Sequence, residues 1–159
     1  VSPIPVLAAG GVDDGRAVAA ALTLGAKGVW VGTAFLASEE ANITRECVQK
    51  IIDTDESGTA VTRFFTGKTA RLLRHPIAPK WEEAGFKSLG MPFQLFSVAE
   101  LLNSLEETGD KDLFVLQAGQ VSGLIKEVKP AKEIFNNLVS GAVSIWKGCR
   151  IDGISIDRK

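Results

Sequence analysis

Two glycine-containing segments of the chain have the residue types of an anion-binding site, and each directly follows a short apolar run. Gly10-Gly11 follows the run at residues 4–9, and Gly32-Thr33 follows the run at residues 28–31. Glycine lets backbone amides approach an anion closely, and a following helix N-terminus adds free N–H groups and a favourable dipole. The Thr33 hydroxyl would add one more donor. These segments are therefore the leading candidates for binding a phosphate group.

A purely structural interpretation of these residues is that Gly10-Gly11 forms a tight turn and that Gly32 permits close packing. Two matched ends favour the phosphate interpretation, because consecutive parallel strands would bring both loops to the same rim. In (β/α)₈ barrels the loops after the last two strands frequently hold a phosphate group.

The first apolar run and the residues after it predict a strand and a helix. Residues 4–9 are continuously apolar, which fits a strand buried on both faces. Asp13 or Asp14 can cap a helix over residues 16–24, and Gly25 suits a left-handed helix stop.

The same order then repeats. Residues 28–31 predict a second strand, and Ser38 followed by two glutamates predicts the start of a helix that continues through Ile52. The unit is strand, helix, strand, helix, and such connections imply a parallel sheet. The predicted fold class is therefore α/β.

The middle of the chain is less periodic. Residues 59–65 fit a strand or an extended segment, whereas residues 66–96 carry too much glycine and proline for long regular elements. Capping-box spacing at Ser97 predicts a helix that ends before Gly109. Residues 112–116 fit a strand or a core-facing loop.

The last predicted element is a helix that opens at Pro130, a good first helical residue. Apolar residues at helical spacing mark one face of it: Ile134, Leu138, Ala142 and Ile145. The residues after it, 148–159, are predicted to be a tail.

Composition excludes several classes of protein. The chain has 159 residues and a formal net charge of −1, which gives no support to a nucleic-acid or membrane-surface binder held by bulk charge. Cys47 and Cys149 are too far apart in sequence for a disulfide framework or a metal-ligand cluster, and we expect a reduced, cytosolic setting. The chain opens at Val1 without methionine, in front of a strand pattern, so we expect it to be a piece of a longer protein.

Other candidate chemistry fails on inspection. Gly67-Lys68-Thr69 resembles the end of a Walker A loop, but Thr62 stands where the upstream glycine is required. No G-x-G-x-x-G follows a strand. His75 is the single histidine and has no evident catalytic partner, and Cys47 is expected to belong to the core. The residues therefore form no acid–base or nucleophile constellation.

Several segments together resemble a known family. The dense part comprises PVLAAGGVDDGR at 5–16 and GVWVGTAFL at 28–36, and FFTGKTAR at 64–71 and QAGQ at 117–120 follow. These segments are similar to the last two strands, and to later parts, of the nitronate monooxygenases, formerly called 2-nitropropane dioxygenases. Members of that family are FMN-dependent TIM-barrel enzymes.

The resemblance implies a fold and a division of the chain. The expected architecture is the C-terminal part of a (β/α)₈ TIM barrel, its last two βα units, with a mainly helical second domain. Residues 1–49 would be the two βα units, 50–112 the helical cap over the flavin, and 113–147 the return loop and closing helix of the barrel.

The resemblance also implies the site. Five residues would bind the FMN phosphate or line its site: Gly10, Gly11, Val31, Gly32 and Thr33. Gln120, in the Ala-Gly-Gln loop, would approach the edge of the cofactor. The family's catalytic histidine belongs upstream of Val1, and His75 does not take that role. Many members have arginine where this sequence has Ala34, so one possible cation is missing.

The leading hypothesis is an FMN-dependent nitronate monooxygenase, which carries out oxidative denitrification of alkyl nitronates with O₂, with this fragment inactive alone. The alternative within the flavoenzymes is an enoyl-acyl-carrier-protein reductase that uses NAD(P)H and has similar glycine loops. A third hypothesis is another phosphate-binding TIM-barrel enzyme that takes a sugar phosphate or a nucleotide. A fourth is an inactive or interaction-only remnant.

Overall fold

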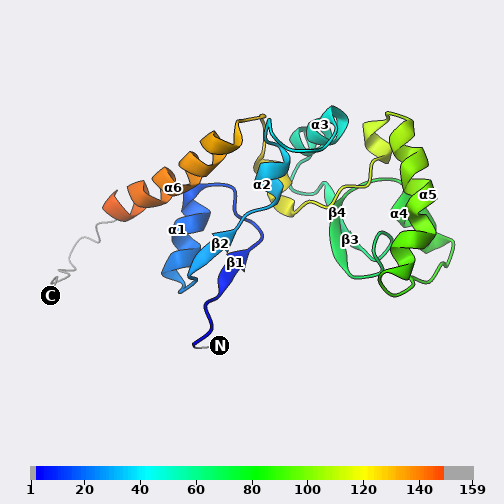
Figure 1. The fold of residues 1–159 in the computed structure, drawn as a ribbon, viewed down its shortest axis with the longest axis horizontal. Helices are drawn as coiled ribbons and strands as arrows, with labels where there is room; N and C mark the ends of the chain where they lie inside the picture. Colours follow the sequence, from blue (N-terminus) through cyan, green and yellow to red (C-terminus); the bar gives the residue numbers. More distant parts are fainter. Residues whose placement is uncertain (1–2, 149–159) are drawn as a thin grey trace.

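The first two strands are parallel neighbours, as their glycine-ended pattern predicts. The structure, a computed structural model, describes residues 3–148. Strand β1 spans Leu7–Ala9 and strand β2 spans Gly28–Trp30, with Leu7 opposite Gly28 and Ala9 opposite Trp30. Both strands therefore end at the same edge of the sheet, which confirms the placement of the two glycine loops together (Figure 1).

The two faces of this strand pair differ in their environment. Val29 packs against the helices, whereas Leu7 is 50% exposed and Trp30 is 68% exposed. Residues opposite each other on paired strands share a face, so the face with Leu7 and Trp30 is open within the described residues. The prediction that the first strand is buried on both faces is wrong within residues 3–148, because helices cover one face of the pair only.

Helix α1 spans Gly15–Thr23 and begins at a side-chain cap. The Asp14 carboxylate accepts the Ala17 N–H at 2.9 Å, so Asp14 rather than Asp13 is the cap. At the other end Gly25 has a φ of +102°, the left-handed conformation expected of it. The local sequence thus determines both ends of α1.

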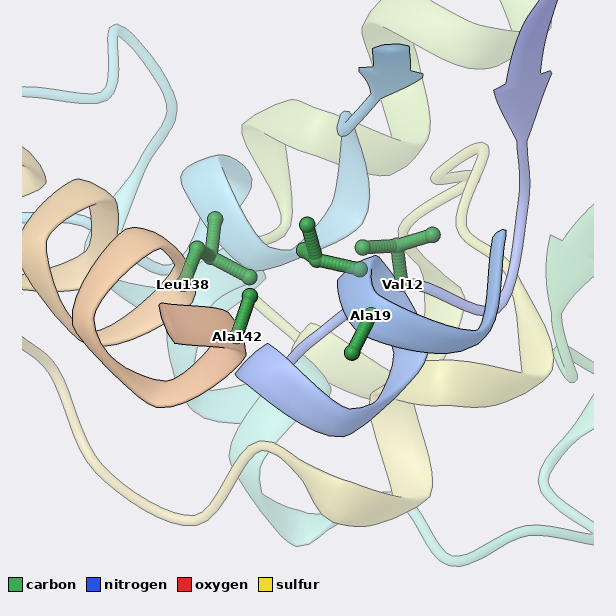
Figure 2. Close-up of a cluster of buried hydrophobic side chains, with 5 residues drawn as sticks. Val12, Ala19, Leu138 and Ala142 are labelled. Atoms are coloured by element: carbon green, nitrogen blue, oxygen red, sulfur yellow. The ribbon is translucent and has the colours of Figure 1, made fainter. Parts of the chain in front are cut away.

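The closing helix α6, Ala131–Gly148, packs directly against α1 and confirms the helix predicted from Pro130. Figure 2 shows Leu138 and Ala142 of α6 facing Ala19 of α1 and the nearby Val12. These side chains are nearly or fully buried and form the apolar cluster that joins the first and last parts of the chain.

The segment after β2 differs from its prediction. A short helix α2, Thr33–Leu36, comes first, and helix α3 spans Arg45–Asp53 with Thr44 as its cap. Ser38 does not start a helix: its hydroxyl donates to the Phe35 carbonyl, and its backbone pairs with Lys129 in an isolated bridge. This bridge and the turn at residues 39–40 that follows it occupy the position where the helix start was expected.

The central segment forms an antiparallel hairpin. Strand β3, Thr59–Thr62, pairs with strand β4, Ala70–Leu73, which confirms the extended segment predicted near residue 59. The Leu116 carbonyl then accepts the Leu73 N–H at 2.9 Å. Of the two alternatives for residues 112–116, the core-facing loop is confirmed, because Phe114 is buried, and the 3₁₀ helix η1, Lys111–Leu113, overlaps the start of the segment.

Two helices follow the hairpin, α4 at Ile77–Glu83 and α5 at Phe93–Glu107. The prediction that α5 starts at Ser97 is wrong by one turn. Gln94 is buried, and both the oxygen and the nitrogen of its side-chain amide are hydrogen-bonded. Its Nε2 donates to the Phe64 carbonyl at 2.6 Å, and its Oε1 accepts the Leu89 N–H at 2.9 Å. The tertiary contacts of Gln94 thus extend the helix toward Pro92.

The described residues contain two two-stranded sheets and no closed barrel. In Figure 1 the β1–β2 pair, α1 and α6 lie at one end, and β3, β4, α4 and α5 lie at the other. The predicted cap, residues 50–112, therefore holds the hairpin as well as helices. The predicted tail from residue 149 and Cys149 lie outside the described residues.

Candidate functional site

Three glycines at the strand ends leave open space beside the backbone. Gly10 and Gly11 have φ values of +90° and +70°, in the left-handed region that favours glycine. A Cβ atom built on Gly10, Gly11 or Gly32 would meet no atom within 4 Å. The loops after β1 and β2 therefore present accessible main chain at one edge of the parallel pair.

Thr33 joins the second loop to a distant part of the chain. Its Oγ1 accepts a hydrogen bond from the Gly119 N–H at 3.0 Å. A hydroxyl that accepts one bond still has its own hydrogen to donate. The loop containing Gly119 and Gln120 thus lies beside the strand-end loops, a contact that the sequence alone did not predict.

Val31 lies in the segment that links β2 to the second loop, but its side chain belongs to the apolar cluster. It packs beside Val29 and Phe35 and lines a small cavity of about 190 Å³ against α6. What Val31 can offer to a ligand at the strand ends is therefore its main chain.

The N-terminus of α1 does not supply the free donors that the sequence suggested. The Asp14 carboxylate takes the Ala17 N–H, and Arg16 pairs with the same carboxylate at 2.6 Å. Gly15, the first residue of α1, is buried against Gly141 and Ala142 of α6. An anion at this edge would therefore be bound by the loops and not by the first turn of α1.

Two carboxylates follow the first glycine loop. Partial burial and the neighbouring Asp14 charge raise the pKa of Asp13 above its ordinary value. Partial burial also acts to raise the pKa of Asp14, but hydrogen bonds from the Ala17 N–H and Arg16 outweigh it and lower that pKa. The Asp14 carboxylate is therefore already paired with the Ala17 N–H and with Arg16.

The strand-end loops fit a phosphate group on the chemistry of their donors. Gly10, Gly11 and Gly32 carry backbone N–H groups next to open space, and Thr33 adds a hydroxyl. Ala34 is 5% exposed and supplies no charge. Recognition here would rest on main-chain donors and one hydroxyl.

Sequence reasoning missed the burial of two polar residues, Lys50 and His75. The Lys50 ammonium donates to the Phe114 carbonyl at 2.8 Å and to the Asp112 carbonyl at 3.1 Å, and burial lowers its pKa. His75 is only 7% exposed, and burial together with the nearby Lys50 charge lowers its pKa to about 4. Neither position carries a motif, so only the contacts reveal them.

Other kinds of site find no support in residues 3–148. No cluster of three or more histidine, cysteine or carboxylate residues in this range could hold a metal ion. Within the same range no helix has the length and apolarity needed to cross a bilayer.

The chain matches part of solved structures that are flavin-dependent TIM-barrel enzymes, which is consistent with a partial barrel. Nitroalkane oxidase from Streptomyces ansochromogenes superposes with a TM-score of 0.82 at 29% identity, over 91% of this chain and 41% of that one. FabK from Thermotoga maritima superposes with a TM-score of 0.73 at 36% identity, over 91% and 46%.

The sequence comparison identifies the family within this class. The model of the family described as nitronate monooxygenase matches residues 1–141, so the chain belongs to that family. A Staphylococcus aureus (strain Newman) protein named "Probable nitronate monooxygenase" is 34% identical over 88% of this chain. The match covers 39% of that protein, so the chain spans about two fifths of its relative's length.

Proposed function

We propose that the whole protein carrying this chain is an FMN-dependent nitronate monooxygenase that performs oxidative denitrification of alkyl nitronates with O₂. The observation that carries the proposal is the pair of open glycine loops at one edge of β1 and β2, in a chain of the nitronate monooxygenase family. The substrates would be a small nitronate and O₂. A cytosolic location remains a prediction.

In this proposal the chain supplies the phosphate end of the flavin site. Backbone N–H groups of the two loops and the Thr33 hydroxyl would bind the FMN phosphate, with the main chain of Val31 beside them: the residues are Gly10, Gly11, Val31, Gly32 and Thr33. Because Gly119 is bonded to Thr33, Gln120 would lie on the cofactor side of the same edge. FMN, when bound, supplies the redox chemistry, and the protein binds and orients it.

We also propose which part of the protein each segment of the chain forms. Residues 1–49 would form the last two βα units of the barrel, residues 50–112 would cover the flavin, and residues 113–147 would return to the barrel through α6. The extensive packing of α6 against α1 supports this return. A catalytic base is not assigned within this chain.

A second candidate is a flavin-dependent enoyl-acyl-carrier-protein reductase that uses NAD(P)H. The observation in its favour is the FabK structure, an enoyl reductase that matches this chain at 36% identity. A phosphate-holding edge at β1 and β2 serves either reaction equally well, since both need the same cofactor in place.

The test separates these reactions in the purified whole protein. Bound flavin is detected by visible absorbance and identified after release, and O₂ uptake is then measured with propyl-2-nitronate. NAD(P)H oxidation is measured in parallel with a crotonyl thioester. Nitronate-dependent O₂ uptake supports the monooxygenase, and thioester-dependent NAD(P)H oxidation alone supports the reductase. A protein that binds no flavin would overturn both and favour another phosphate-binding barrel.

A further inference from the structure

A second cavity lies between the β3–β4 hairpin and the start of α4. It has a volume of about 400 Å³, and apolar side chains form most of its wall. They come from both strands and from α4: Ala60, Leu72, Leu73, Ala78 and Pro79. None of the strand-end glycines lines this cavity, so it is a separate site from the proposed flavin loops.

One polar side chain in this wall has no partner. His75 lines the cavity and is 7% exposed, and within residues 3–148 neither of its ring nitrogens makes a hydrogen bond. Its ring packs near Phe64, with centroids 5.6 Å apart. Buried polar groups in folded proteins are nearly always hydrogen-bonded, so the imidazole lacks the partner that such a group normally has.

Of the other polar residues that line the cavity, Thr62 is buried and engaged, whereas Arg74 and Asp112 lie at the exposed rim. The Thr62 hydroxyl donates to Glu82 at 2.7 Å and accepts the Phe64 N–H at 3.1 Å. Arg74, at the rim, donates its Nε–H to the Ser57 carbonyl at 2.8 Å. Within the described residues, the imidazole of His75 is therefore the buried polar group of this wall that has no partner.

The surroundings also set the charge of such a molecule. Burial and the Lys50 ammonium hold His75 neutral at physiological pH, since its pKa is lowered to about 4. A neutral imidazole has one acceptor and one donor nitrogen. The apolar part of the wall, where His75 lies, disfavours a charged group beside it, and Arg74 and Asp112, one cation and one anion, lie at the exposed rim.

We infer that this cavity binds a compact, uncharged, mainly apolar molecule with one hydroxyl group. The hydroxyl donates to the acceptor nitrogen of His75, and the apolar body packs against Leu72, Leu73 and Ala78. This inference rests on the hairpin, α4 and the nearby Lys50 of α3, and does not depend on the proposed flavin chemistry.

The experiment uses phenol and toluene as probes, with the whole protein labelled with ¹⁵N in its histidines. The His75 ring signals are those absent from the His75→Phe variant. Phenol should shift them saturably and should bind at least tenfold more tightly than toluene. His75→Phe should remove that preference. Phenol that leaves the His75 signals unmoved, or that binds no better than toluene, would overturn the inference.

A matched pair of substitutions locates the binding. Ala78→Leu fills the cavity and should weaken phenol binding at least tenfold. Ala84→Leu makes the same change at an exposed position at the end of the same helix, and should leave binding unchanged. Equal binding by the two variants would place the phenol elsewhere and refute the site. If Ala78→Leu fails to fold, the loss of the phenol preference in His75→Phe decides the question.

Discussion

The hydroxyl of Thr33 accepts a hydrogen bond from the Gly119 N–H at 3.0 Å, although the two residues are 86 positions apart. Thr33 begins α2 at the end of the second parallel strand, and Gly119 precedes the 3₁₀ helix η2, Gln120–Leu124. This bond joins the two segments that the family resemblance relates to the flavin. It also leaves the Thr33 hydrogen free for a ligand.

Replacing Thr33 tests this link. Thr33→Val removes the acceptor of the Gly119 N–H and should lower the free energy of unfolding by about 1 kcal/mol. It should also weaken FMN binding, because a donor to the phosphate is lost. Thr33→Ser keeps the hydroxyl and should retain both properties. Urea unfolding and FMN titration of the whole protein measure the two effects, and equal FMN affinity in the Val and Ser variants would contradict the prediction.

The glycine loops should not tolerate a carboxylate. Gly11→Asp and Gly32→Glu place a negative charge where the phosphate is proposed to bind, so each variant should be purified without FMN. Gly109→Asp is the matched control for Gly11, because Gly109 also has a positive φ and open space around it. Gly148→Glu serves in the same way for Gly32. Full flavin occupancy in Gly11→Asp and Gly32→Glu would refute the phosphate assignment.

The contact of α1 with α6 should tolerate no side chain at Gly15. A Cβ atom there would overlap the backbone of Gly141 and Ala142, so Gly15→Ala should cost about 1–3 kcal/mol of stability. The same change at Gly148, an exposed helical position with open space, should be neutral or stabilising. Thermal melts of the two variants give the comparison, and equal melting temperatures would disprove the close packing.

His75 should make the stability depend on pH. Its pKa is about 4 in the folded state and near 6.5 when unfolded, so between these values the unfolded state binds more protons. Stability therefore rises with pH across this window, and is lost as the pH falls from about 6.5 toward 4, by roughly 1.4 kcal/mol for each unit of pKa difference. His75→Phe should flatten the profile from urea unfolding at several pH values. An unchanged slope in that variant would assign the dependence to other groups.

The buried ammonium of Lys50 should contribute more to the stability of the fold than an exposed ammonium does. Lys50→Met leaves the Asp112 and Phe114 carbonyls without their donor and should cost about 3 kcal/mol. Lys111→Met breaks only an exposed ion pair with Asp53 and should change stability little. Equal urea midpoints for the two variants would show that the Lys50 bonds contribute nothing.

Prediction from the sequence succeeded where the signal is local. A cap at Asp13 or Asp14 and the stop at Gly25 were predictable because a helix end depends on a few neighbouring residues, and the structure selects Asp14. It failed at Ser38 and Ser97, although both have the pattern of a helix cap. Ser38 pairs with the backbone of Lys129 instead, and the contacts of Gln94 start the helix one turn before Ser97. Each failure has the same cause, a distant partner for the backbone or the side chain.

The candidate site divides in the same way. Apolar runs ending in glycine were enough to predict the parallel pair and the open loops at Gly10 and Gly32, since strand, turn and glycine preferences act over a few residues. The bond from Gly119 to Thr33 and the burial of Lys50 and His75 depend on segments tens of residues apart. Which of them meet is decided by packing of the whole chain, so only the tertiary structure could establish these contacts.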